Sequence, residues 1–160
     1  MNTYQLRRPD NSIATTVIAS SMPPAVAPNK GVWELVPPVV PTLADTITAK
    51  LADLAAYRYS RETGGITVGG ATVPTTRDSQ ALITGAYTAL KNGVTSQVNY
   101  KAAGGIWLTL TAAQFYPVAE AVFGHVQACF DNERAHSQAI QALTSGATVQ
   151  AYDFTTGWPA

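Results

Sequence analysis

Hydrophobic residues recur every three or four positions in the last third of the chain, which predicts one long amphipathic helix from Thr111 to Gly146. Thr111 suits the N-cap and Gly146 suits the residue after the last turn. At 1.5 Å per residue such a helix is about 50 Å long, more than a domain of this size needs. We therefore expect the rest of the chain to fold onto it and its far end to reach a partner. Pro117 lies in its first two turns, where the helix can begin or kink.

Two helix–hairpin units precede this helix. Thr42 opens the first helix, with Asp45 in the capping-box position, and Gly64-Gly65 ends it. The second helix is expected from residues 75–79 to Asn92-Gly93. Each is followed by two short alternating runs around glycines, at 66–73 and 98–110, which is typical of β-hairpins. The predicted fold class is α+β: three helices and two β-hairpins (a small antiparallel sheet), with the long C-terminal helix as spine. The expected core residues are Phe115, Val118, Val122, Val126 and Phe130, with Leu82, Ile83, Leu51 and Trp107.

The chain is expected to have three parts: an N-terminal arm (1–41), an α+β domain (42–146) and an aromatic C-terminal tail (147–160). In the arm, residues 3–6 and 14–18 favour two short strands. Two proline clusters, at 22–28 and 37–41, favour an extended linker; the alternative is a disordered leader. In the tail, residues 147–149 favour a short strand, and the following aromatics favour packing in this chain or on a neighbour.

Composition narrows the possible partners. The 160 residues carry no net charge, only 12% are charged and 46% are hydrophobic. Few charges on a neutral chain disfavour binding to nucleic acid or to an anionic membrane, and assembly into a homo-oligomer would cover the remaining apolar surface. The single cysteine excludes an intrachain disulfide. No signal peptide and no membrane-spanning run is evident, so we expect a soluble product made in the cytoplasm, without membrane insertion.

The sharpest metal candidates lie on the long helix. His125, Cys129, Glu133 and His136 share one face at spacings of four, four and three. They extend about 16 Å along the axis, too far for one ion, so only a pair such as His125 and Cys129 could share a metal. Cys129 fits better as a small buried hydrophobe and His125 as a hydrogen-bonded helix residue. We therefore predict no metal and no cofactor.

The sequence also gives little indication of a catalytic site. Cys129 and His125 resemble a thiol–imidazole pair, but their face is apolar and no oxyanion loop follows. Carboxylates for glycan hydrolysis would come from only ten acids, most of them on helix exteriors. The six acids expected mostly on helix exteriors are Asp53, Glu62, Asp78, Glu120, Asp131 and Glu133. We predict that the protein is not an enzyme and has no catalytic residues.

Several strings, in this order, carry a resemblance to a known family. They are Arg58-Tyr59-Ser60-Arg61-Glu62-Thr63-Gly64-Gly65-Ile66-Thr67-Val68, Thr75-Thr76-Arg77-Asp78-Ser79-Gln80-Ala81-Leu82-Ile83, Tyr100-Lys101, Trp107, and His125-Val126-Gln127-Ala128-Cys129-Phe130 with Glu133. Over about residues 45–143 the chain resembles a domain of unknown function common in tail-fibre and tail-assembly proteins of tailed bacteriophages. The final aromatic residues also look like endings seen in such proteins.

The resemblance implies a structural or adaptor protein of a phage tail (tail fibre, tail tip or baseplate), located in the virion and acting through other tail proteins such as fibre, hub or baseplate components. Two alternatives stay open: an assembly chaperone for the fibre that the virion does not retain, and a small hydrolase of cell-surface glycan. The family has no assigned catalytic residues, so the resemblance transfers none.

Exposed aromatic and arginine residues are the best candidates for partner binding, because both types are enriched at protein interfaces. The alternative for the helix end at 57–61 is an ordinary structural role, in which one tyrosine packs within the fold and the arginines are solvated. The candidates are Trp33, Tyr57, Arg58, Tyr59, Arg61, Tyr152, Phe154 and Trp158.

Overall fold

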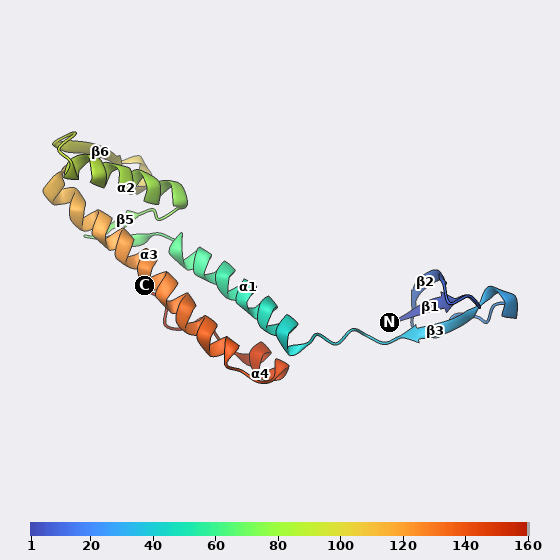
Figure 1. The fold of residues 1–160 in the computed structure, drawn as a ribbon. Coiled ribbons are helices and arrows are strands. Elements are labelled where there is room, and N and C mark those ends of the chain that lie inside the picture. The colour runs from blue at the N-terminus through green and yellow to red at the C-terminus, as the bar shows by residue number, and fades with distance from the viewer. Residues whose placement is uncertain (160) are drawn as a thin grey trace. The chain divides into compact units, whose positions relative to one another are not determined.

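The computed structural model describes residues 1–159 and divides into two compact units, Met1–Pro41 and a second unit that begins at Thr42 (Figure 1). The first unit is an antiparallel sheet with the strand order β2-β1-β3. Its strands are β1 (Asn2–Arg7), β2 (Ile13–Ala19) and β3 (Val32–Val36). Tyr4 and Leu6, alternate residues of the central strand, are buried and form its small core.

The sequence pattern predicts β1 and β2 but not β3, where it predicts a proline-rich extended linker. The prolines lie in the flanking loops and in the 3₁₀ turn η1 (Pro28–Lys30), so β3 itself contains none and can pair with β1. Gly31 makes this pairing possible. It is buried with a φ of +119°, and an added Cβ would overlap the main-chain carbonyl of Arg7, so only glycine fits.

The second unit contains four helices and two hairpins, so the predicted α+β fold class is confirmed. Its elements are α1 (Leu43–Glu62), β4 (Ile66–Val68), β5 (Ala71–Val73), α2 (Arg77–Lys91), β6 (Gln97–Lys101), η2 (Ala103–Gly105), β7 (Trp107–Thr111), α3 (Ala112–Gln141) and α4 (Gly146–Ala151). The 30-residue helix α3 is the spine, with α2 and the hairpins along its first half and α1 and α4 along its second (Figure 1).

The two hairpins do not join, contrary to the expected single sheet: β4–β5 and β6–β7 are separate two-stranded sheets. Each hairpin turns its apolar residues onto the same hydrophobic cluster around α3. Ile66 and Val68 reach that cluster from one hairpin, and Val98, Tyr100 and Leu110 reach it from the other. The contact with α3 therefore takes the place of edge-to-edge pairing.

Three threonines start the helices as the sequence predicts. Thr42 forms a capping box with Asp45, and the hydrogen bonds donated by Thr42 hold the pKa of that carboxyl below its usual value. The Thr76 side chain accepts from the Ser79 amide at the start of α2. Thr111 forms the cap of α3 together with Gln114. These caps satisfy main-chain N–H groups that have no partner within the helix.

The end of the long helix differs from the prediction. Helix α3 ends at Gln141, and Gly146 begins the short helix α4 instead of following the long one. The Ser145 side chain accepts from the Thr148 amide and starts this new helix. The strand expected at 147–149 is therefore wrong: Val149 lies in α4, and helical geometry turns it into the core.

Two apolar clusters hold the second unit together, and α3 contributes to both. The hairpin core comprises Val73, Ile83, Leu90, Phe115 and Val122. The tail core comprises Leu54, Ile140 and Val149, with Leu51, Tyr152, Phe154 and Trp158 packed against it. Burial of such side chains contributes about 1.5–3 kcal/mol each, so both clusters stabilise the unit.

The core of α3 follows a different face from the one predicted. Phe115, Val122 and Cys129 are buried as expected, but His125 is buried in place of Val126, and Phe130 is exposed. Successive steps of four residues turn about 40° away from a helix face each time, whereas alternating steps of three and four stay on it. Three predicted core residues are instead exposed: Leu82 (73%), Trp107 (68%) and Phe130 (40%).

Two phenylalanines on α3 provide a matched test of this assignment. Phe115 is fully buried, whereas Phe123 is 66% exposed. We expect Phe115→Ala to lower the free energy of unfolding by about 3–5 kcal/mol, because it leaves a cavity in the hairpin core. Phe123→Ala should change it by less than about 0.5 kcal/mol. Urea denaturation of both variants measures the difference, and equal losses would contradict the assignment.

Candidate functional site

An apolar groove runs between α2 and α3, and we call it the α2–α3 groove. Its volume is about 370 Å³. Its lining consists of Gln80, Ile83, Thr84, Tyr87, Ala119, Glu120, Val122, Phe123 and Val126. Most of these residues are apolar, and the polar ones carry a single charge, that of Glu120. The groove can therefore hold an apolar side chain of a partner but offers few groups to a charged ligand.

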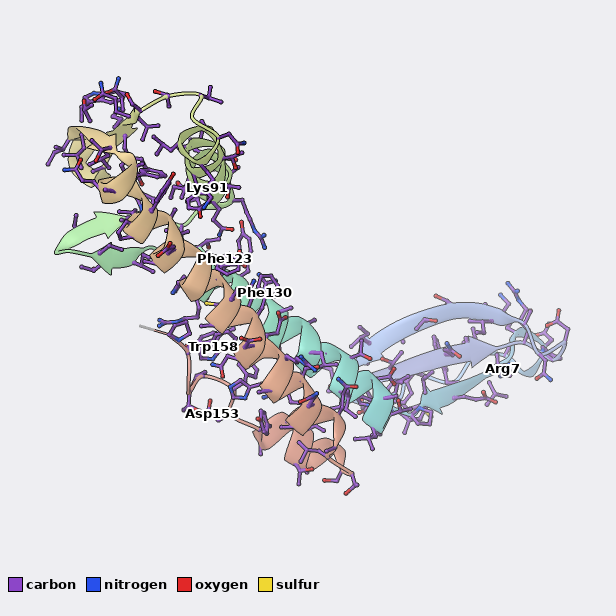
Figure 2. All side chains as sticks on the ribbon, turned by 60° about the vertical axis from the view of Figure 1, so that its left-hand side comes forward. Arg7, Lys91, Phe123, Phe130, Asp153 and Trp158 are labelled. Carbon is purple, nitrogen blue, oxygen red and sulfur yellow. The ribbon has the colours of Figure 1, made fainter. Side chains whose placement is uncertain are left out.

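Phe123 gives this groove an exposed aromatic wall. The residue projects from α3 and is 66% exposed although it belongs to the groove lining (Figure 2). Tyr87 forms part of the opposite wall, and its ring lies 5.0 Å from that of Tyr116, centroid to centroid. An aromatic ring that is packed on one side and open on the other is the kind of side chain most enriched where proteins bind each other.

A buried carboxylate fixes α1 and α2 against each other, and we call its surroundings the Glu62 junction. Glu62 is the last residue of α1 and is 0% exposed. Its carboxylate accepts hydrogen bonds from Arg58, from Arg77 Nη2 (3.1 Å) and from Gln80 Nε2 (3.1 Å). Arg58 Nε also donates to Glu133 Oε2 (2.9 Å), which ties the junction to α3. A buried charge is tolerable only when it is paired in this way.

Main-chain contacts strengthen the same junction. Buried Thr75 donates its hydroxyl hydrogen to the Glu62 carbonyl (2.6 Å), and its oxygen accepts from the Gly65 amide (2.9 Å). Gln80 donates to both the Glu62 carboxylate and the Thr75 carbonyl (2.8 Å). Because Gln80 also lines the α2–α3 groove, the junction fixes one wall of the groove.

The thiol and imidazole considered as a metal or nucleophilic pair lie together but are occupied. Cys129 Sγ lies 3.8 Å from His125 Nε2, and the same nitrogen donates its hydrogen to the Arg61 carbonyl (3.1 Å). A nitrogen that carries a hydrogen cannot bind a metal. Burial raises the pKa of the Cys129 thiol, and nearby Glu62 adds to this effect, so the nucleophilic thiolate is disfavoured. Among residues 1–159, no three His, Cys, Asp or Glu side chains are placed to hold a metal ion together.

The C-terminal tail lies against α1 and α3 through an aromatic cluster. His136 Nε2 donates to the Thr156 carbonyl (3.1 Å), so its Nδ1 accepts from the Tyr152 hydroxyl (2.8 Å). Trp158 stacks on the His136 ring, 5.9 Å between centroids. Tyr57 of α1 contacts the tail from the other side, 5.4 Å from the Trp158 ring. The tail is thus part of the folded unit.

Electrostatic and main-chain contacts hold the rest of the tail. Arg61 donates to the Pro159 carbonyl (2.7 Å), and Lys50 donates to the Gln150 carbonyl (3.0 Å). The Lys50 ammonium also lies 5.0 Å from the Phe154 ring centroid. Hydrogen bonds donated by Thr155 lower the pKa of Asp153, which stabilises the turn that follows α4.

Six of the eight residues predicted to bind a partner therefore contact other parts of the same unit. Tyr57, Arg58 and Arg61 lie on α1, and Tyr152, Phe154 and Trp158 lie in the tail that covers it. Tyr59 is exposed, with the Arg77 guanidinium 5.9 Å from its ring. Trp33 lies in the first unit, half-buried, and donates its Nε1 hydrogen to the Pro24 carbonyl (3.1 Å). Their role in partner binding remains a prediction.

The sequence analysis missed the α2–α3 groove and the Glu62 junction. In the sequence, Phe123 is an apolar residue beside the buried stripe of α3, and a residue at that position can form the wall of a groove. Glu62 gave no such signal, because a single acid at a helix end is usually solvated. Only the tertiary fold brings Arg77 and Gln80 to it.

Comparison with protein families gives one match. A family described as a domain of unknown function (DUF4376) matches residues 45–156. The match covers most of the second unit, including α4 and the tail as far as Thr156, and leaves the three-stranded sheet outside. No curated protein and no solved structure matches the chain. Within residues 1–159 no helix has the length and apolar character needed to cross a membrane.

Two tryptophans, one in the tail and one outside it, provide a second matched pair of variants. Trp158 packs on the tail core, whereas Trp107 is 68% exposed on β7. We expect Trp158→Ala to lower the free energy of unfolding by about 2–4 kcal/mol, since the substitution removes aromatic contacts with His136 and Tyr57. Trp107→Ala should cost less than about 1 kcal/mol. If thermal or urea unfolding shows no cost for Trp158→Ala, the tail is not an integral part of the unit.

Proposed function

The chain belongs to the DUF4376 family of domains of unknown function, and we propose that it is a structural adaptor of a bacteriophage tail. In this proposal it is a component of the tail fibre, tail tip or baseplate, is made in the host cytoplasm and resides in the virion. It acts by binding other tail proteins and has no catalytic role. The phage context rests on the resemblance of residues 45–143 to tail-fibre and tail-assembly proteins.

The observation that supports a binding role is the α2–α3 groove with Phe123 on its wall. The groove has a volume of about 370 Å³ and is lined mainly by apolar side chains. Exposure of Phe123 to water costs about 25 cal/mol per Å² of apolar surface, and a docked partner would recover that free energy. Two helical walls suit the apolar face of a partner helix, whose side chains enter such grooves at intervals of three and four residues.

The groove is fixed in shape before any partner arrives. Gln80 in one wall is held by the Glu62 junction, and Ile83 and Val122 at its base belong to the hairpin core. A preformed groove loses little conformational entropy on binding, so more of the contact free energy appears as affinity. This rigidity supports a role as a docking platform.

The carboxylates of the Glu62 junction and the thiol of Cys129 support the absence of a catalytic role. The Glu62 carboxylate is fully buried and accepts from three donors, while Glu133 pairs with Arg58. A general acid or base must reach its substrate, and these two carboxylates are occupied within the chain. The thiol of Cys129 is buried.

A phage that carries single substitutions in this chain tests the proposal. Phe123→Glu places a charge on the groove wall, and we expect it to lower the amount of the protein in purified particles by about tenfold or more, the loss typical of an interface hot spot. Val94→Glu is the control, because Val94 is an exposed apolar residue of the same unit outside the groove. Quantitative mass spectrometry of particles measures both, and the melting temperatures of the isolated proteins should be unchanged.

The outcomes separate the alternatives. If particles contain the unsubstituted protein and Phe123→Glu is incorporated equally well, the groove is not the docking site. If the unsubstituted protein is absent from particles yet is needed for fibre attachment, it is an assembly chaperone and the adaptor proposal fails. Glycan release by the purified protein would contradict the absence of a catalytic role.

A further inference from the structure

Apart from a bulge at Ala14, the β2 edge of the N-terminal sheet lacks the features that usually stop a sheet edge from pairing with another strand. The order β2-β1-β3 leaves β2 and β3 each with one unpaired side. Natural edge strands are blocked by charges, by prolines or by shortness. Strand β2 has seven residues, Ile-Ala-Thr-Thr-Val-Ile-Ala, with no charge and no proline. Its threonine, valine and isoleucine residues also favour the extended conformation.

The opposite edge shows the contrast. Strand β3 has five residues, carries the charged Glu34, and is followed directly by Pro37 and Pro38. Glu34 pairs with Arg7 across the sheet (2.8 Å). The loop after β2 also packs toward this edge, since Trp33 donates to the Pro24 carbonyl (3.1 Å). Within the first unit, β2 is therefore the open edge and β3 the protected one.

The register of β2 defines a regular segment. Leu6 pairs with Thr15 and Arg7 with Ile13, so a bulge at Ala14 interrupts the ladder. From Thr15 to Ala19 the pairing with β1 is continuous. Val17 is the central residue of this segment. If two such strands run antiparallel, Thr15 lies opposite Ala19, Thr16 opposite Ile18, and Val17 opposite the second Val17.

We propose that β2 pairs antiparallel with β2 of a second copy of this chain, about a two-fold axis at Val17, so that two sheets become one of six strands. This pairing brings no like charges together, and it places a β-branched pair at its centre, which is favourable across strands. Ile18 is 69% exposed and would be covered partly by Thr16 of the second copy. An uncharged strand offers a charged partner no electrostatic attraction, whereas a second copy is matched by symmetry. The proposal does not depend on the α2–α3 groove.

The predicted contact is small. A pair of five-residue segments buries much less than the roughly 1,200 Å² typical of stable complexes, so we expect dissociation constants in the micromolar range. In an assembly that holds several copies close together, a weak contact of this kind would be strengthened by the high local concentration.

Opposite charges at Thr16 provide the first test. Thr16 is exposed, lies opposite Ile18 of the second copy in the proposed pair, and is diagonal to the second Thr16 on the same face of the sheet. Sedimentation up to about 100 µM should show the unsubstituted chain moving from 16.8 kDa toward twice that mass. Thr16→Lys and Thr16→Glu should each stay monomeric because like charges meet, and an equimolar mixture should associate again. Gln5→Lys adds the same charge on the central strand and should associate as the unsubstituted chain does.

Single cysteines provide a second test that does not depend on charge. Val17 and Leu35 both pair with Tyr4, one on each edge of the sheet. Under mild oxidation, Val17→Cys should form a covalent dimer, because directly opposed residues have Cα atoms within the 4.4–6.8 Å that a disulfide needs. Leu35→Cys should not. The native Cys129 is buried and should not contribute.

Each outcome decides the proposal. Recovery of association in the Lys–Glu mixture, together with cross-linking at Val17 alone, supports pairing through β2. A chain that remains monomeric throughout the concentration series overturns it. Association that survives Thr16→Lys, or equal cross-linking at Val17 and Leu35, shows that another surface joins the copies and also overturns it.

Discussion

The second unit depends on one buried charge, the carboxylate of Glu62. It has no exposed surface, and three side chains donate to it: Arg58 from α1 itself and Arg77 and Gln80 from α2. Removing one partner of a buried pair typically costs about 3–5 kcal/mol, a large part of the stability of a small domain. The direction of the chain after α1, through β4 and β5 into α2, is therefore fixed by the need to bring these donors to Glu62.

This junction lies between the α2–α3 groove and the C-terminal tail. On one side, Gln80 connects it to the α2–α3 groove, and on the other, the neighbouring Arg61 holds the main chain of the C-terminal tail at Pro159. Helix α3 runs past both and contributes to the hairpin core and the tail core. A platform that binds other proteins benefits from such rigidity, because its surface is already in the bound shape.

Local signals in the sequence were enough for the elements, but not for their contacts. The threonine caps and the glycine pairs are local, so α1, α2 and both hairpins of the second unit were predictable. The face of α3 was not, because a run of four-residue steps through Val126 and Phe130 is as apolar as the true stripe through His125 and Cys129. Strand β3 was hidden by the prolines around it, and the Glu62 junction needs two donors that lie 15 and 18 positions further along the chain, Arg77 and Gln80. Predicting Phe123 as a groove wall required knowing where α2 lies.

Hydrogen exchange of a Glu62→Gln variant tests most directly whether this junction couples the two halves of the unit. Glu120→Gln is the control, because Glu120 is exposed on α3. The account predicts that amides of α2 exchange at least about tenfold faster in Glu62→Gln, a loss of about 1.4 kcal/mol or more, while Glu120→Gln behaves as the unsubstituted chain. Unchanged exchange of α2 in Glu62→Gln would contradict the account, since the buried charge would then not hold the structure together.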